Sequence, residues 1–327
     1  MSAVLVTGAT GLAGSEVCRL LRARGDAVRA LVRDAEAAAP LAAMGAEIFE
    51  GDVTDAASVR KAAEGCGAAI HCAALLGGAS QDLADFEAVN HRGTVHLLDA
   101  AEATGMGRVV ALSTSTFFDT RGEGHLEEAP IADEPGDDPY TVTKLAAFRE
   151  AHERAAAGRD VLTCHPGAIF GPGPLPRRAL HPTSFNRVLL AALQGKIRRY
   201  LSFPVTWVLA EDVARGSIAA LDRGKAGGRY WLDGGPGAVT STAGGCNRVC
   251  EIAGVPHRVE DVEVSDDPAL VAEFGPTLVS IAKQDRGDPS KRPRPGITEQ
   301  QLGYRPTPFD TGLRALVAWL RELGRIE

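Results

Sequence analysis

The 327 residues suffice for one large domain or two closely packed ones, and 45% hydrophobic with 24% charged residues is ordinary globular composition. A net charge of -7 argues against a nucleic-acid surface, which would gather Arg and Lys. No run of about 18 uncharged apolar residues occurs, so we expect no membrane span. The chain passes from Met1 into an apolar strand without a cleavable leader, which predicts a cytoplasmic protein. The six scattered cysteines predict buried free thiols, not disulfides or a metal site.

The first predicted strand, residues 4–6, runs into a turn with three glycines spaced three apart, and a helix is expected over 15–24. Gly8 permits the turn, Gly11 lets the backbone approach a pyrophosphate, and Gly14 lets the helix pack on the strand. Free N–H groups and the helix dipole face the anion. The turn therefore predicts a dinucleotide site. Its remaining candidate contacts are Thr7, Thr10 and Leu12.

Short β-branched runs then alternate with helical segments as far as residue 170. Strands are expected at 27–32, 46–49, 68–72, 109–112 and 161–165, and helices near 36–44, 55–64, 83–104 and 140–157. This alternation predicts an α/β fold with a Rossmann-type doubly wound parallel sheet.

The regular alternation ends at the Gly- and Pro-rich segment 171–176. We therefore expect a dinucleotide-binding domain over 1–170, to which 205–233 returns as a helix (205–221) and a strand (229–232). Residues 171–204 and 234–327 would form a smaller C-terminal substrate-binding lobe, closing with an amphipathic helix at 309–323.

The end of the second strand bears on cofactor choice. An NAD site usually places an acidic residue there for the ribose 2′-hydroxyl, whereas an NADP site offers Arg to the 2′-phosphate. Val32 fills the acidic position and Arg33 follows it, which favours NADP. Asp34 keeps NAD possible.

Tyr140 and Lys144 stand four residues apart at the start of a predicted helix, so their side chains share one face. A neighbouring ammonium favours the phenolate, and this would lower the tyrosine pKa from its usual value of about 10 toward a range useful for acid–base catalysis. Taken alone, the pair is a common coincidence on helix surfaces. Its position at the same sheet edge as the glycine turn makes it a candidate catalytic pair.

Together these motifs resemble the extended short-chain dehydrogenase/reductase family, the NAD(P)-dependent epimerase/dehydratase group, and within it the dihydroflavonol-reductase-like enzymes. The resemblance covers nearly the whole chain. Beyond the glycine turn and the Tyr–Lys pair, the matching segments are 51–53, 71–74, 90–94, 165–167, 171–173 and 208–214. It implies further cofactor contacts at Asp52, Val53, Ala73, Ala74, Asn90, Pro166 and Gly167. Helix capping by Asp52, strand-end packing by the two alanines and helix bridging by Asn90 are the structural alternatives.

The resemblance also implies a catalytic hydroxyl at the end of the fifth strand, and it places Thr114 there with Ser113 and Ser115 as neighbours. Thr114 and Tyr140 would hold a carbonyl oxygen, Tyr140 would supply the proton, and Lys144 would hold the nicotinamide ribose. The expected reaction is hydride transfer between NADPH and a small uncharged ketone or aldehyde.

Two other functions stay open. A nucleotide-sugar epimerase of the same family is disfavoured because Ser115 and Thr116 replace the acidic pair of sugar dehydratases and Ala168 replaces a pyrophosphate-binding Asn. A non-catalytic NADP-sensing regulator would be expected to lack Tyr140 and Lys144, and both are present. We expect a small-molecule substrate, no nucleic-acid, metal or membrane partner, and a possible homodimer through the helices that carry Asn90 and Tyr140.

Overall fold

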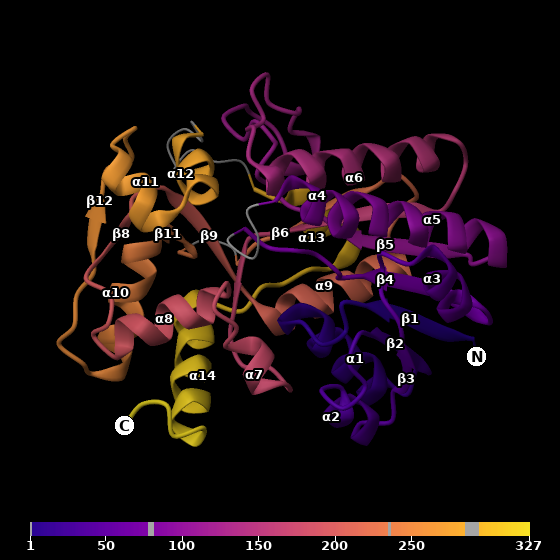
Figure 1. The fold of residues 1–327 in the computed structure, drawn as a ribbon, viewed down its shortest axis with the longest axis horizontal. Coiled ribbons are helices and arrows are strands. Elements are labelled where there is room, and N and C mark those ends of the chain that lie inside the picture. The colour runs from indigo at the N-terminus through magenta and orange to yellow at the C-terminus, as the bar shows by residue number, and fades with distance from the viewer. Residues whose placement is uncertain (1, 78–81, 235–236, 285–293) are drawn as a thin grey trace.

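The computed structural model describes residues 2–77, 82–234, 237–284 and 294–327 (Figure 1). Its centre is a seven-stranded sheet of order β10-β6-β5-β4-β1-β2-β3 in which every neighbouring pair is parallel. This confirms the predicted fold class. The strands are β1 (Ala3–Thr7), β2 (Val28–Val32), β3 (Glu47–Glu50), β4 (Cys66–His71), β5 (Arg108–Leu112), β6 (Val161–Pro166) and β10 (Arg229–Leu232).

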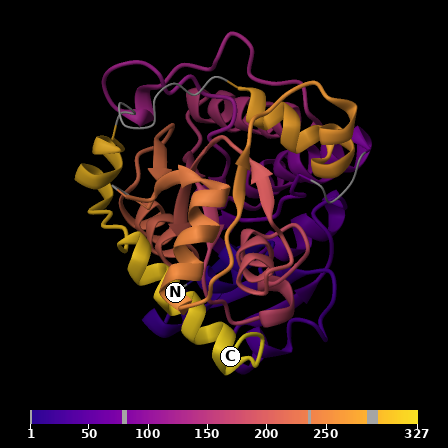
Figure 2. The same cartoon turned by 90° about the vertical axis from the view of Figure 1, so that its left-hand side faces the viewer.

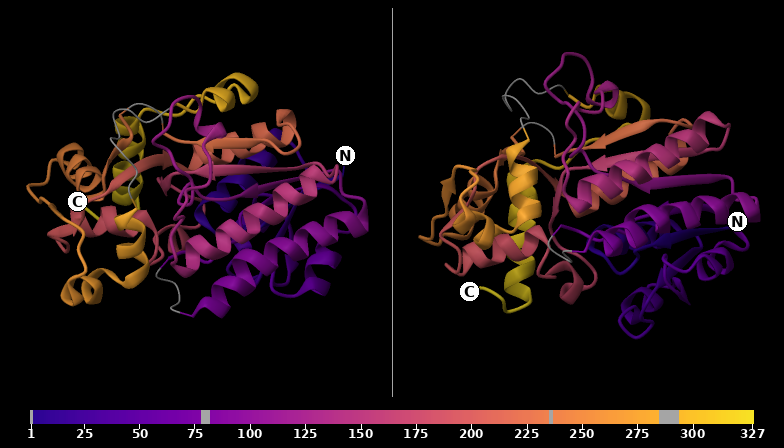
Figure 3. Two further views of the ribbon diagram at one scale, coloured as in Figure 1. Left: turned by 90° about the horizontal axis from the view of Figure 1, so that it is seen from above. Right: turned by 45° about the horizontal axis from the view of Figure 1, so that its top comes forward.

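Helices cover both faces of the sheet, as alternating burial in β1 illustrates. Val4 and Val6 pack into the cluster under α1 (Leu12–Arg24) and α9 (Ala210–Arg223), while Leu5 points to the opposite cluster. That second cluster lies under α3 (Ala56–Ala63), α5 (Gly93–Thr104) and α6 (Pro139–Ala156), of which α5 and α6 run side by side (Figure 3). Because strands buried on both faces need apolar residues at nearly every position, the sequence reads as continuous apolar runs.

The order of the strands reverses at β1. From β1 the chain builds outward through β2 and β3, then crosses back to β4 on the other side of β1. Open parallel sheets bind ligands at such a switch point, beyond the carboxyl ends of the strands. The glycine turn follows β1 and residues 72–74 follow β4, so both lie at this crevice.

The second lobe holds two small sheets and most of the remaining helices, and it faces the viewer in Figure 2. Buried Trp207 lies in its core, in ring contact with Phe170, Phe185 and Phe309. Its strands are β7 (Ala168–Phe170), β9 (Pro204–Leu209), β11 (Val239–Ser241), β8 (Arg199–Leu201) and β12 (Glu260–Val262). Its helices are α7 (Pro176–Ala179), α8 (Phe185–Leu193), α10 (Thr242–Ala253), α11 (Pro268–Phe274), α12 (Pro276–Lys283) and α14 (Phe309–Glu322).

Several predicted boundaries change. The helix expected over 205–221 is wrong in its first part, because Pro204–Leu209 forms strand β9, which pairs with β7 and β11 in the lobe; the helix is α9, and only β10 joins the main sheet. The helix expected over 83–104 is divided into α4 (Leu83–Phe86), a π-helix (Glu87–Arg92) and α5. The helix expected near 36–44 shortens to α2 (Ala39–Ala43), and α13 (Gly296–Leu302) was not expected. The closing helix is confirmed as α14.

All six cysteines are free, and only Cys72 is not fully buried. Within the described ranges, none of the helices combines the length and apolar character that a membrane crossing demands.

Candidate functional site

The glycine turn has the geometry of a phosphate cradle. Gly8 has a φ of 62°, and a Cβ there would lie 2.5 Å from the Ala73 nitrogen. A Cβ on Gly14 would lie 2.3 Å from the Gly8 carbonyl oxygen, so only glycine lets α1 approach the strand end this closely. Gly11 is the N-cap of α1 and provides no side-chain cap. The first N–H groups of α1 are therefore available to an anion, and Thr10 and Leu12 lie on either side of Gly11.

A buried histidine supports this turn from below. His71 Nδ1 lies 2.7 Å from Thr7 Oγ1, and its Nε2 lies 3.0 Å from Thr94 Oγ1. Because the Thr94 hydroxyl donates to the Asn90 carbonyl, the network assigns the ring proton to Nε2 and makes Nδ1 the acceptor. Burial, aided by the Lys144 charge, lowers the pKa of His71 to about 3. The Thr7 hydroxyl is therefore hydrogen-bonded to His71 in the core, beneath the predicted cofactor site.

The loop after β4 is fixed by Asn90. Its side chain is fully buried, accepts from the Leu75 N–H at 2.7 Å and donates to the Leu75 carbonyl at 3.1 Å. It also donates to Thr143 Oγ1 on α6 at 3.3 Å. Asn90 therefore bridges the loop to the helix of Tyr140, while Ala74 lines the pocket and Ala73 packs against Gly8.

The candidate catalytic side chains meet at the carboxyl end of β5. Asp138 caps α6 by accepting from the Thr141 N–H at 3.0 Å, and this places Tyr140 in the first turn. Thr114 and Tyr140 line the same pocket. Ser113 Oγ is instead buried without a hydrogen-bond partner among the described residues. Lys144 Nζ donates to the Leu112 carbonyl at 2.8 Å.

The predicted lowering of the Tyr140 pKa is wrong. Burial raises it above the usual 10, the Thr114 side chain opposes this rise, and the Asp138 charge adds to it. Lys144 is itself buried, which lowers its pKa to about 8. The helical spacing correctly places the two side chains on one face, but the ammonium is held at a backbone carbonyl. The phenol therefore stays protonated at neutral pH, the form that can donate to a carbonyl oxygen.

A second buried histidine, which sequence reasoning missed, holds the Thr114 backbone. His165 Nδ1 lies 2.8 Å from the Thr114 carbonyl oxygen, so this nitrogen is the donor, and Nε2 accepts from Thr163 Oγ1 at 2.9 Å. The Thr163 oxygen lies 3.3 Å from His152 Nε2 on α6. His165 also stacks on Trp231, with ring centroids 5.0 Å apart. The one available signal was a histidine at the end of the sixth strand, in the segment 165–167.

These groups open onto one large pocket of about 940 Å³ between the sheet edge and the lobe. Of the predicted site residues it is lined by Gly11, Leu12, Ala74, Thr114, Tyr140, Lys144, Pro166 and Gly167. A Cβ on Gly167 would lie 2.1 Å from the Thr206 carbonyl oxygen, so glycine lets β9 close this wall.

Arg33, Asp52 and Val53, which were also predicted to contact the cofactor, are not among the residues that line this pocket. Arg33 follows β2 and is exposed, and the Gly51 N–H donates to the Val32 carbonyl, which brings Asp52 to the same edge. Asp52 Oδ1 accepts from the Thr54 N–H at 2.9 Å and so caps its own turn. Val53 is buried, and its carbonyl lies 2.9 Å from His96 Nδ1.

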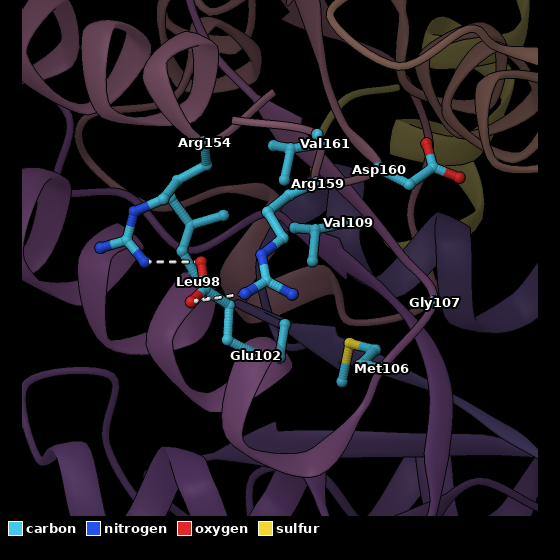
Figure 4. Close-up of a pocket in the computed structure, with 11 residues that line it drawn as sticks. Leu98, Glu102, Met106, Gly107, Val109, Arg154, Arg159, Asp160 and Val161 are labelled. Atoms are coloured by element: carbon cyan, nitrogen blue, oxygen red, sulfur yellow. Dashed lines mark hydrogen bonds and ion pairs between the residues drawn. The ribbon is translucent and has the colours of Figure 1, made fainter. Parts of the chain in front are cut away.

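A smaller pocket of about 220 Å³ lies at the opposite edge, where β5 and β6 begin (Figure 4). Glu102 accepts there from Arg154 at 2.8 Å and from Arg159 at 3.3 Å. Because parallel sheets bind ligands beyond their carboxyl ends and these charges already satisfy one another, we assign this pocket no role.

The NAD dependent epimerase/dehydratase family matches residues 4–232. The chain belongs to this family. It is 29% identical over 340 residues to sterol demethylase protein B of Methylococcus capsulatus, covering 98% of this chain and 99% of that protein. It is 29% identical to a Synechocystis protein named for dihydroflavonol 4-reductase, over 69% and 66% of the two chains. The crystal structure of gox2253 superposes with a TM-score of 0.83 at 25% identity, covering each chain fully.

Membership confirms the predicted resemblance, and with it an enzyme that uses a nicotinamide cofactor. A nucleoside-diphosphate-sugar epimerase from Pseudomonas aeruginosa superposes with a TM-score of 0.78 over 100% and 99% of the two chains, at 22% identity. That likeness establishes the fold alone. The glycine cradle at Gly8 and Gly14, which a single Cβ would fill, fits the pyrophosphate of such a cofactor.

Proposed function

We propose that this family member is an NADP-dependent reductase of a small-molecule ketone or aldehyde, acting through Thr114, Tyr140 and Lys144. One observation carries the proposal. Thr114, Tyr140 and Lys144 line the same pocket as the uncapped start of α1, and burial raises the pKa of Tyr140, so its phenol is protonated at neutral pH. A protonated phenol beside a second hydroxyl suits delivery of a proton to a carbonyl oxygen.

Each residue has a defined task. Bound NADPH would supply the hydride and become NADP⁺. The hydroxyls of Thr114 and Tyr140 hold the substrate oxygen, and the Tyr140 proton passes to that oxygen as the carbonyl becomes an alcohol. Lys144, now donating to the Leu112 carbonyl, would hold the nicotinamide ribose. The backbone of 11–14 and the side chains of Arg33 and Asp52 would hold the rest of the cofactor.

The choice of NADP is supported at the end of β2. Arg33 is exposed there, free of any ion pair to the described residues. Asp34 Oδ1 instead accepts from the Ala37 N–H at 2.9 Å, which occupies the carboxylate oxygen in a local turn. A guanidinium with free donors suits the 2′-phosphate of NADP.

Reduction is favoured over sugar epimerisation by the residues at the pocket wall. Ser115, Thr116 and Ala168 line it, so neither an acid pair nor an amide is offered at these positions. The arginines that could meet a phosphate, Arg177, Arg178, Arg198 and Arg199, are not among its lining residues.

We also propose that the protein acts in the cytoplasm, as a homodimer through α5 and α6.

The experiment is an NADPH oxidation assay on a panel of ketones, aldehydes and UDP- and dTDP-sugars. Turnover with carbonyl compounds and none with nucleotide sugars is expected. Tyr140→Phe should bind NADPH as tightly as wild type yet lose turnover, because the ring packs while the proton donor is gone. A variant that retains more than about a tenth of the rate would remove Tyr140 from the mechanism. Stoichiometric bound NAD with sugar conversion would overturn the proposal.

A further inference from the structure

The pocket is larger than its catalytic wall requires. Its volume of about 940 Å³ lies at the upper end of the roughly 300–1,000 Å³ usual for ligand sites. Yet Arg33, Asp52 and Val53, where the adenosine end of the cofactor is proposed to lie, do not line it. The pocket thus serves the pyrophosphate and nicotinamide part of the cofactor together with the substrate, and its lobe side is left for the substrate.

The lobe side of the wall is mainly apolar, and its polar side chains are uncharged hydroxyls such as Ser184, Thr206 and Thr277. It is formed by side chains from α8, β8, the segment before β9, α11 and α12. Tyr200 and Phe274 meet edge to face with centroids 5.6 Å apart, and burial raises the pKa of Tyr200 to about 12, so this phenol stays neutral. The apolar wall consists of Phe185, Tyr200, Phe203, Phe274, Leu278 and Ile281.

Charge is confined to the catalytic end. Among the described residues that line the pocket, the Asp, Glu, Lys and Arg side chains are Asp137, Asp138 and Lys144, all within four positions of Tyr140. Arg199, which precedes the lining residue Tyr200, is paired with Glu273 outside the wall. No described residue of the apolar wall would provide a cation to a carboxylate or phosphate at the lobe end, and the desolvation of such an anion is strongly unfavourable.

Helix α12 encloses this apolar end. Ser280 Oγ donates to Asp137 Oδ1 at 3.0 Å, and Gln284 Nε2 donates to the Pro135 carbonyl at 3.0 Å. These bonds hold Leu278 and Ile281 over the segment that leads into the catalytic helix. The apolar body of a substrate whose carbonyl lies at Tyr140 would therefore be covered by α12.

We infer that the substrate is an uncharged ketone or aldehyde with the carbonyl at one end of a long or polycyclic apolar body, which lies against the apolar wall. The inference rests on the proposed reductase function and specifies its substrate class. Each methylene buried contributes about 0.8 kcal/mol, which is about fourfold in kcat/KM. Selectivity then comes from apolar length, not from a second charged contact.

The test is a series of methyl ketones from 2-butanone to 2-undecanone, assayed with NADPH. We expect kcat/KM to rise about fourfold per methylene until the pocket is filled. The keto acid 10-oxoundecanoate, matched in length, should be more than about 100-fold poorer than 2-undecanone because no described residue of the apolar wall offers its carboxylate a cation. A kcat/KM that is independent of chain length, or a preference for the keto acid, would overturn the inference and leave the reductase function standing.

Two variants locate the effect. Leu278→Ala should lower kcat/KM about tenfold for 2-undecanone and less than about twofold for 2-butanone, because the longer ketone places more methylenes against α12. Leu323→Ala, a partly buried leucine at the end of α14 outside the wall, should change neither. Equal losses on both ketones with Leu278→Ala would show that α12 does not contact substrate.

A binding measurement separates this inference from the function on which it rests. Tyr140→Phe saturated with NADP⁺ is titrated with both ketones by calorimetry. Tighter binding of 2-undecanone supports the apolar wall even if the wild type reduces no ketone, in which case the proposed reductase function alone fails. Equal or undetectable binding of both ketones counts against the wall.

Discussion

Acid sensitivity provides a test of the two buried imidazoles. His71 and His165 are at most 1% exposed, and both rings need a single proton to satisfy their hydrogen bonds. Burial lowers the pKa of His165 to about 3, aided by His152, Arg229 and Lys144 and opposed by the bond to Thr114. The folded protein therefore excludes protons that the unfolded chain binds.

The sign and size follow from proton linkage. Between the folded pKa near 3 and the unfolded value near 6.5, the unfolded chain carries the proton, so the free energy of unfolding falls as pH falls through this window. Between pH 7.5 and pH 5.5 each histidine lowers the free energy of unfolding by about 1.4 kcal/mol. This value is the same for any folded pKa below about 4.5. Two such residues cost about 3 kcal/mol, a large part of the roughly 5–15 kcal/mol of a typical domain.

The assay is urea unfolding at both pH values for wild type and His165→Asn, whose amide N–H can still donate to the Thr114 carbonyl. Between pH 7.5 and 5.5, the free energy of unfolding should fall by about 1.4 kcal/mol more for wild type than for the variant. Comparing the two losses cancels other groups, such as Glu16, whose pKa burial raises. The exposed His181→Asn is the control and should lose as much as wild type. If the free energy of unfolding of His165→Asn falls as much as that of wild type, His165 is not a buried neutral imidazole in the folded protein.

Three further outcomes are expected. Arg33→Ala should weaken NADPH binding by about 1.5–3 kcal/mol and leave NADH binding nearly unchanged in fluorescence titrations, and equal losses would make Arg33 structural. Gly8→Ala should lower the free energy of unfolding by about 1–3 kcal/mol more than Gly105→Ala, because both glycines have positive φ but only the Gly8 Cβ meets backbone. Val142→Glu, at an exposed α6 position, should convert a dimer to a monomer in sedimentation, and an unchanged mass would exclude this face.

The alternation of strands and helices could be predicted because a strand covered on both faces must be apolar at nearly every position. The same property caused the error at Val205. The buried run of β9 leads into α9 without a Gly or Pro between them, so its apolar residues are compatible with either structure. The segment is a strand because it pairs with β7 and β11 in the folded lobe.

Residue roles that depend on distant partners could not be predicted. Thr7 has the right position for a cofactor contact, but its hydroxyl is bound to His71, 64 residues away. The apolar wall is contributed by segments between residues 185 and 281 that share no motif, and only folding brings Phe185 and Ile281 into one pocket. The Tyr140 environment is similar: spacing places Lys144 nearby, but burial and the Leu112 carbonyl determine its effect.

The two histidines also explain why the catalytic edge can be rigid without being highly charged. His71 ties the end of β1 to α5 under the glycine turn, and His165 ties the end of β6 to the Thr114 backbone. An ion pair in place of either histidine would bury a further charge near Lys144. The Lys144 charge already contributes to the lowered pKa of both imidazoles. Neutral rings leave Lys144 as the one described cation of the pocket wall. The electrostatic field at Tyr140 is therefore set by few groups, which suits a reaction whose substrate is itself uncharged.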